Sequence, residues 1–312
     1  MDILVLHPGA LGDIILSLPA LEILRRRFSQ ARITLAANLD FAGVVAADYV
    51  DSLLSFSGLP LHNLFGSGPV PAVDRRFWSA FDRIVSWTGF GDPQFARNLN
   101  SFHKFVLVVP WKPQAGETRH VARIFVDSIR PWVGEQREIP TPSLSINPAD
   151  LASGEQWLTG RGWKADRPMV ALHPGAGSIA KRWPLENFRE LAGRFVQSGL
   201  QLLIIEGPAE DGLSERMADG IPGGLMMAAR GLPLRTLAGL LRFCTTFVGN
   251  DSGISHLAAV LNVPTLVLFG PSRPEQWAPS GARVKTLAAA HGCIACVSVD
   301  SVWNALDHCR HC

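Results

Sequence analysis

The sequence predicts an α/β fold built from two similar Rossmann-like halves that face each other across a cleft. The chain has 312 residues, of which 47% are hydrophobic and 18% charged, which is ample apolar content for two packed cores. A strand–loop–helix rhythm opens the chain and restarts near its middle. The run Leu6–Ala10 recurs letter for letter as Leu172–Ala176, both times after a first strand. These observations favour two related domains, 1–150 and 151–312.

The first half begins with a strand over 2–6, a Gly-rich loop over 7–13 and an amphipathic helix over 14–28. A second strand at 32–37 completes a β-α-β unit, which is typical of a parallel sheet. Residues 58–70 are expected to form a loop, and two further strands are predicted at 84–87 and 105–109. A polar segment with three prolines over 138–150 is predicted to link the halves.

The second half repeats the pattern, with a strand at 169–172 and a Gly-rich loop at 173–181. The remaining predicted elements are helices at 185–198, 233–243 and 252–261, and strands at 202–206, 246–249 and 265–269. Because the carboxyl ends of parallel strands share one edge of a sheet, the loops that follow them should meet there.

Composition excludes several classes of protein. With 29 basic and 27 acidic residues the formal charge is only +2, so nothing indicates a nucleic-acid binder. No apolar stretch is long enough to span a bilayer, and an acid at Asp2 stands where a signal peptide would be cationic. A cytoplasmic location is therefore expected.

The first loop, His7–Asp13, places glycines at a strand end, where the backbone can approach a ligand. Asp13 puts a carboxylate where a phosphate would otherwise bind. This disfavours a nucleotide phosphate here and favours an acid/base or sugar-binding role. Capping of the following helix explains an aspartate at this position equally well.

The second loop carries flexible glycines, a hydroxyl group and two cations ahead of a helix expected to start at Pro184. Backbone donors together with Lys181 and Arg182 would suit a diphosphate, although the Walker spacing is absent. A surface turn with solvated cations is the alternative. The residues that would bind the diphosphate are Gly175, Gly177, Ser178 and Lys181.

The third polar strand end is Gly249–His256, which follows a buried strand and opens a helix. Asp251 and Ser252 are both ready helix caps, and His256 is as typical of a core as of a binding site. Glu206 and Glu210 flank another strand end, where an acid could bind ribose hydroxyls.

The cysteines gather at the carboxyl end of the chain. Two C-x-x-C pairs, Cys293 with Cys296 and Cys309 with Cys312, are separated by 12 residues. Such pairs resemble a structural zinc site, although the gap is shorter than zinc ribbons use. Reduced thiols in a tail are the other interpretation.

Taken together, several motifs resemble glycosyltransferase family 9, the ADP-heptose:lipopolysaccharide heptosyltransferases. They are Leu11–Asp13, Lys181–Pro184, Gly249–Gly253 followed by His256–Ala259, Val263–Pro264 and Phe269–Pro271. The resemblance covers both halves in order. It implies a GT-B fold, with acceptor binding in the first domain and nucleotide binding in the second. It also implies inverting transfer that requires no cofactor or metal ion.

The resemblance also implies residue roles. Asp13 matches the family's general base and Lys181 its lysine on the donor diphosphate. Donor contacts are expected from Glu210, Asp251, Ser252, Gly253 and His256. Acceptor contacts are expected from His7, Gly12, Arg119 and Arg123, with His7 departing from the arginine or lysine of many relatives.

The expected reaction moves a heptose from ADP-heptose to an anionic inner-core glycolipid carrying Kdo or heptose, at the inner membrane's cytoplasmic face. A basic excess between Arg97 and Arg130 suits such an acceptor. Two alternatives stay open: a family 9 transferase with another sugar or acceptor, and a nucleotide-sugar-binding protein without turnover. A dehydrogenase is disfavoured because no G-x-G-x-x-G loop occurs.

Overall fold

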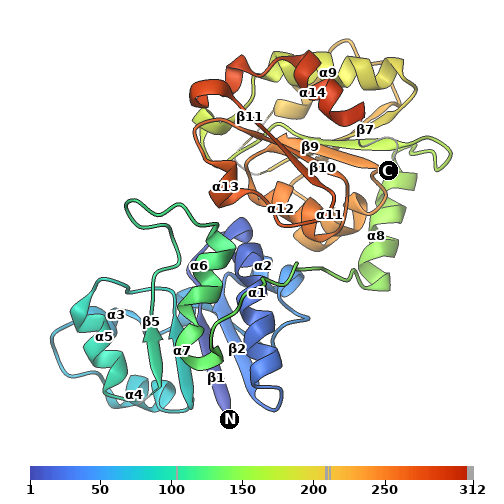
Figure 1. Cartoon of the computed structure of the whole chain (residues 1–312). Helices are drawn as coiled ribbons and strands as arrows, with labels where there is room; N and C mark the ends of the chain where they lie inside the picture. Colours follow the sequence, from blue (N-terminus) through green and yellow to red (C-terminus); the bar gives the residue numbers. More distant parts are fainter. Residues whose placement is uncertain (103–104, 208–209, 211, 308–312) are drawn as a thin grey trace. The chain divides into compact units, whose positions relative to one another are not determined.

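The computed structural model describes all residues except 103–104, 208–209, 211 and 308–312. The chain divides into two compact units, Met1–Pro142 and Ser143–Cys312, which we refer to as unit 1 and unit 2. The division falls ahead of the boundary predicted at residue 150, because helix α8 (Pro148–Thr159) packs on helix α11 (Leu234–Leu241) of unit 2. Each unit contains its own parallel sheet (Figure 1).

Unit 1 contains a five-stranded parallel sheet in the order β3-β2-β1-β4-β5. Its central strand β1 pairs with both neighbours, so that Leu6 lies beside Ala36 and Ser86. The carboxyl ends of these three strands therefore meet at one edge. The strands are β1 (Asp2–Leu6), β2 (Arg32–Ala37), β3 (Ser52–Ser55), β4 (Arg83–Ser86) and β5 (Val106–Val108).

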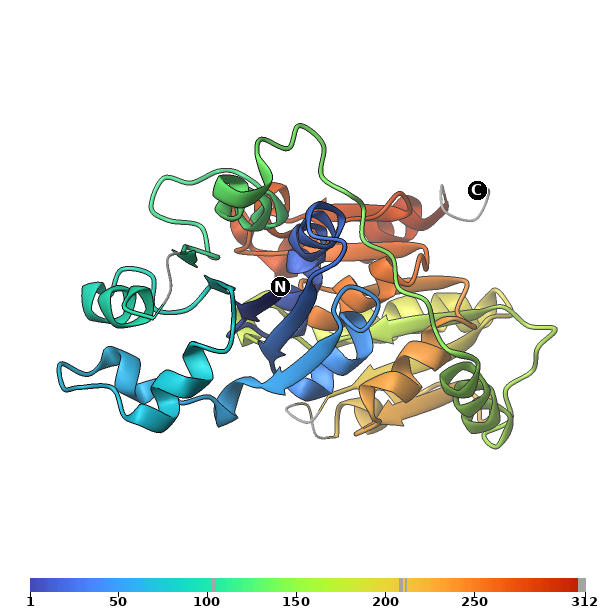
Figure 2. The same ribbon diagram turned by 90° about the horizontal axis from the view of Figure 1, so that it is seen from below.

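The helices of unit 1 form two groups. Helix α1 packs on α6 and α7, whereas α3 packs on α5. Figures 1 and 2 both show α3, α4 and α5 gathered at the β5 side of the sheet, away from α1. The helices are α1 (Leu11–Arg27), α2 (Leu39–Val45), α3 (His62–Phe65), α4 (Ala72–Trp78), α5 (Pro93–Asn100), α6 (Val121–Ser128) and α7 (Arg130–Val133).

Unit 2 contains a six-stranded parallel sheet in the order β11-β10-β9-β6-β7-β8. At its centre His173 pairs with Gly249, which aligns the loops after β6 and β9. The strands are β6 (Met169–His173), β7 (Gln201–Glu206), β8 (Met226–Arg230), β9 (Thr246–Asn250), β10 (Thr265–Phe269) and β11 (Val284–Ala288). The other helices are α9 (Leu185–Gln197), α10 (Leu213–Ala218), α12 (Gly253–Val260), α13 (Pro274–Trp277) and α14 (Val299–Asp307).

The central strands of unit 2 are buried along their whole length, as expected where helices cover both faces of a parallel sheet. One of its core clusters joins Leu172 and Ile204 of the sheet to Trp183, Phe188 and Val302. Each fully buried aliphatic side chain of this kind contributes about 1.5–3 kcal/mol to folding. The core therefore fixes the strand ends that carry the polar loops.

Several elements differ from those predicted. The first helix begins at Leu11 rather than Ile14, and the predicted loop over 58–70 contains the short helix α3. Pro184 is the N-cap of α9, so the helix itself begins at Leu185. No helix among the described residues combines the length and apolar character needed to span a bilayer.

Candidate functional site

His7 follows β1 in unit 1 and is completely buried. Its ring stacks on Phe125 at 5.4 Å between centroids and meets Trp87 edge-on at 5.3 Å. The Nδ1 atom accepts a hydrogen bond of 3.0 Å from the backbone N–H of Gly9. Burial lowers the pKa of His7 to about 3, so the ring is neutral at physiological pH.

Asp13 lies in the first turn of α1, and its carboxylate accepts a 2.9 Å hydrogen bond from the backbone N–H of Ala10. Ala10 is the N-cap, so the alternative in which Asp13 is the N-cap is wrong. Asp13 is the third residue of the helix, and its carboxylate accepts from the N–H of the N-cap residue, as in a capping box. A Cβ on Gly9 would lie 2.5 Å from the Cβ of Asp13 and 2.7 Å from Cε1 of His7. Only glycine lets this loop pass between the two side chains.

A cavity of about 520 Å³ opens at the carboxyl ends of β1, β2 and β3. We call it the β1–β3 cavity. Its lining residues are His7, Pro8, Gly9, Ala10, Ala37, Asn38, Leu39, Asp40, Phe41, Ser55, Phe56 and Ser57. The cavity is thus bordered by the loop whose last N–H binds Asp13.

The two arginines expected to contact an acceptor are engaged with acids. Arg119 pairs with Glu117 and, at 2.6 Å, with Asp127, and Arg123 pairs with Asp127 at 3.1 Å. The hydrogen bond from Arg119 lowers the pKa of Glu117 to about 2. Both arginines that the sequence assigns to an acceptor thus lie in ion pairs with neighbouring acids.

In unit 2 the second Gly-rich loop passes beside a buried acid. A Cβ on Gly175 would lie 1.8 Å from Oε1 of Glu210, which requires glycine there. Glu210 also accepts a 2.9 Å hydrogen bond from the N–H of Gly207 and lies 3.8 Å from Arg182. Arg182 in turn donates to the carbonyl of Ala176 at 3.0 Å.

Lys181 meets the third polar strand end directly. Its Nζ lies 2.6 Å from Oδ2 of Asp251, and the hydroxyl of Ser272 donates to the same oxygen at 2.6 Å. The Asp251 side chain is 8% exposed and that of Lys181 34%, so the lysine is the more accessible member of the pair. The structure thus joins two of the predicted donor loops at one point.

Asn250 also connects the two loops, and sequence reasoning did not assign it a role. Its side-chain Nδ2 donates to the carbonyl of Pro174 at 2.8 Å, while Oδ1 accepts from the N–H of Trp183 at 3.1 Å. The only signal in the sequence was an asparagine between Gly249 and Asp251 at the end of a predicted strand. The structure shows that Asn250 is buried, and buried polar side chains are normally hydrogen-bonded.

The remaining predicted donor residues separate into distinct roles. Ser252 is the N-cap of α12 and Gly253 its first residue, whereas Asp251 does not cap the helix. His256 is buried within α12, and Gly177 and Ser178 are exposed in the loop after β6. Glu206 is occupied, because it accepts from the N–H groups of Gly212 and Ser214 and pairs with Arg230.

Comparison with known proteins decides the family. Residues 100–305 match the family model described as glycosyltransferase family 9 (heptosyltransferase). The chain belongs to glycosyltransferase family 9. Lipooligosaccharide heptosyltransferase 2 of Haemophilus influenzae is 28% identical over 52% of this chain and 48% of its own. Lipopolysaccharide heptosyltransferase 2 of Escherichia coli K12 is 32% identical over 48% and 45%. These alignments span about half the length of either relative.

Solved structures agree on the fold of this family 9 protein. A family 9 glycosyl transferase from Veillonella parvula superposes with a TM-score of 0.82 at 19% identity, covering 99% of this chain and 96% of that one. The E. coli ADP-heptose lipopolysaccharide heptosyltransferase II gives 0.79 at 19% identity, covering 99% and 98%. Two parallel sheets of the Rossmann type, as in the GT-B fold, are confirmed.

The cysteines of this family 9 chain are only partly described. Cys293 and Cys296 are exposed at short 3₁₀ turns, and the N–H of Cys296 donates to the carbonyl of Cys293 at 2.9 Å. A hydrogen bond from the Cys296 side chain lowers the pKa of Cys293. Cys309 and Cys312, the other half of the zinc hypothesis, lie outside the described residues. Within the described part, no three His, Cys, Asp or Glu residues are grouped as a metal would require.

Proposed function

We propose that this protein is an inverting glycosyltransferase that moves a heptose from ADP-heptose to a lipopolysaccharide inner-core sugar. The observation that carries the proposal is the Lys181–Asp251 pair at the head of α12. It places a partly exposed cation beside backbone N–H donors at a parallel-sheet edge, which is an arrangement suited to a diphosphate. Family membership and the names of the relatives indicate the sugar.

The donor would bind in unit 2. Lys181 would supply positive charge to the leaving diphosphate, and the N–H groups at the start of α12 would add hydrogen bonds to it. Glu210 is the acid available for ribose hydroxyls, because Glu206 is already used to hold α10. Asn250 keeps the two donor loops in register.

The acceptor would bind in unit 1, where Asp13 is the proposed general base. An ionised carboxylate at a helix start is stabilised by the N–H groups there. It takes the proton from the acceptor hydroxyl while that oxygen forms its bond to the anomeric carbon and the ADP departs. Attack opposite the leaving group inverts the configuration. Because the proposed acceptor is a glycolipid, the reaction would occur at the cytoplasmic face of the inner membrane.

Asp13→Asn tests this proposal. Asparagine keeps an oxygen that can accept from Ala10 but is a negligible base. Turnover should fall about 10²–10⁴-fold, while the affinity for ADP-heptose and the melting temperature stay near those of the parent. Asp48→Asn, an exposed acid elsewhere in unit 1, is the matched control. Parental turnover in Asp13→Asn would show that Asp13 only caps α1, and would favour a nucleotide-sugar-binding protein or another base.

A further inference from the structure

The residues that line the β1–β3 cavity of unit 1 carry no positive charge that could bind an anionic acceptor. None of the residues that line it is lysine or arginine, and Asp40 is its only acid. Asp40 is exposed and takes part in none of the ion pairs among the described residues, so its negative charge is available to a ligand. His7, the one lining residue that could carry a positive charge, stays neutral because it is buried.

Three basic residues of the stretch expected to bind an anionic acceptor, Arg97 to Arg130, have other partners. Arg119 and Arg123 pair with the acids Glu117 and Asp127. Lys112 lies over the ring of Trp111, with 4.4 Å from Nζ to the ring centroid, and does not line the cavity. Among the described residues, those that line the cavity thus offer no countercharge to a carboxylate or phosphate.

The groups that do line the cavity suit hydroxyls. Ser55 and Ser57 present hydroxyls 3.0 Å apart at the end of β3. Asn38 uses its Oδ1 to cap α2 and retains its Nδ2 donors. Asp40 can accept two hydrogen bonds from neighbouring hydroxyls of one sugar ring.

Apolar surface accompanies these polar groups. Phe41 and Phe56, both half-buried, line the same cavity, and Leu39 is 45% exposed beside them. Binding sites of this kind combine apolar walls with a few placed polar groups. The C–H face of a sugar ring can pack on such a wall while its hydroxyls reach the serines and the acid.

From these observations we infer that the acceptor sugar entering the β1–β3 cavity is an uncharged, polyhydroxylated sugar, such as a heptose, and not a sugar acid such as Kdo. The inference rests on the proposed function, since it assigns the acceptor of that transfer. A sugar carboxylate about 4 Å from Asp40 would be disfavoured by charge repulsion about fivefold, even with the dielectric constant of water.

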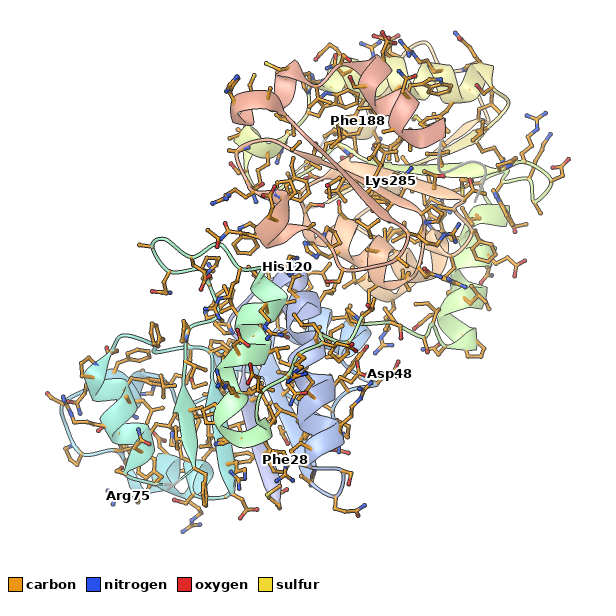
Figure 3. All side chains as sticks on the ribbon, in the orientation of Figure 1. Phe28, Asp48, Arg75, His120, Phe188 and Lys285 are labelled. Carbon is orange, nitrogen blue, oxygen red and sulfur yellow. The ribbon has the colours of Figure 1, made fainter. Side chains whose placement is uncertain are left out.

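The first experiment measures binding of the acceptor class independently of transfer. Saturation-transfer-difference NMR of the full chain, without donor, compares methyl heptoside with methyl Kdo glycoside at low ionic strength. Heptoside signals should exceed those of Kdo by about fivefold, and Asp40→Asn should shrink this ratio towards one. Asp48→Asn is the matched control, since Asp48 is exposed and outside the cavity lining (Figure 3), and it should leave the ratio unchanged.

The second experiment measures transfer from ADP-heptose to the same two glycosides. A higher kcat/KM for the heptoside, reduced selectively in Asp40→Asn, would support the inference. Preference for Kdo in either assay, no binding of either glycoside, or a ratio insensitive to Asp40 would overturn it. Heptoside binding without transfer to any acceptor would instead count against the proposed function while leaving the charge preference of the cavity in place.

Discussion

The backbone of Gly175 lies directly against the carboxylate of Glu210, so that a Cβ at Gly175 would be 1.8 Å from Oε1. Gly9 and Asp13 show the same relationship in unit 1, with 2.5 Å from a Cβ on Gly9 to that of Asp13. The repeated sequence therefore serves a shared purpose. In both units a glycine after the central strand makes room for an acid beside the candidate site.

Gly175→Ala should displace Glu210 from the loop, because the buried carboxylate cannot share this space with a methyl group. We expect donor affinity to fall about tenfold, as for loss of a hydrogen bond to a charged group. Calorimetric titration with ADP-heptose measures the effect. Gly223→Ala is the matched control, because Gly223 lies outside the donor loops of unit 2 and no atom lies within 4 Å of a Cβ there. Equal affinities in the two variants would remove Glu210 from the donor site.

Lys181→Ala should weaken donor binding by about 1.5–3 kcal/mol, the usual contribution of a hydrogen bond to a charged group. Because the Lys181 side chain is 34% exposed, dissolved salt screens its charge. The loss of donor affinity should therefore be largest at low salt. Lys285→Ala, which removes an exposed lysine of edge strand β11 (Figure 3), serves as the control. Unchanged ADP affinity in Lys181→Ala would refute its assignment to the diphosphate.

His7 is expected to position the loop that holds Asp13. His7→Phe keeps a ring but leaves the Gly9 N–H without its acceptor, which costs about 1–3 kcal/mol when such a group is buried. His7→Asn loses the ring but retains an acceptor near Nδ1. We therefore expect kcat to fall more in His7→Phe than in His7→Asn, with the KM for donor unchanged in both. A larger fall in His7→Asn would mean that ring packing, and not the hydrogen bond, positions the loop.

His7 should also make stability depend on pH. Its pKa is about 3 in the folded protein, against an ordinary value of 6.5 in an unfolded chain, so the unfolded chain binds the extra proton between these values. Stability contributed by neutral His7 is thus lost as the pH falls from about 6.5 to about 3. The parent should lose more of its free energy of unfolding over this range than His7→Asn, as urea denaturation at a series of pH values would reveal. Parallel curves would contradict the assignment.

Cys293 and Cys296 are predicted to be structural rather than catalytic. If the two cysteines form a metal site with Cys309 and Cys312, replacing both by serine should lower the melting temperature. The turnover of the folded fraction should be retained in either case. Elemental analysis of the purified parent and variant measures bound zinc directly. A well-folded variant without transfer activity would contradict the structural role. Absence of zinc from the parent would favour reduced thiols.

The strands missed from the sequence, β3, β8 and β11, all lie at sheet edges. Edge strands are partly exposed, so their hydrophobic patterns are weak, as in the mixed burial of β8 and β11. Predicted and observed bounds coincide for β1, β2 and β10, which are almost wholly buried apolar runs bounded by turn residues. The central strands were therefore predictable, whereas of the edge strands only β5, predicted at 105–109 and observed at Val106–Val108, was recognised.

The sequence alone determined the α/β class, the repeated strand–loop–helix plan and the three polar strand ends. These features could be predicted because each is marked by a local pattern: a run of apolar residues for a buried strand, and glycines for the turn that follows it. Only the tertiary structure decided which charges meet. Lys181 and Asp251 are 70 residues apart, and Glu206 is taken by α10 while Glu210 lies beside Gly175. Such pairings depend on the order of strands in the sheet and on the path of each loop, which local sequence patterns do not encode.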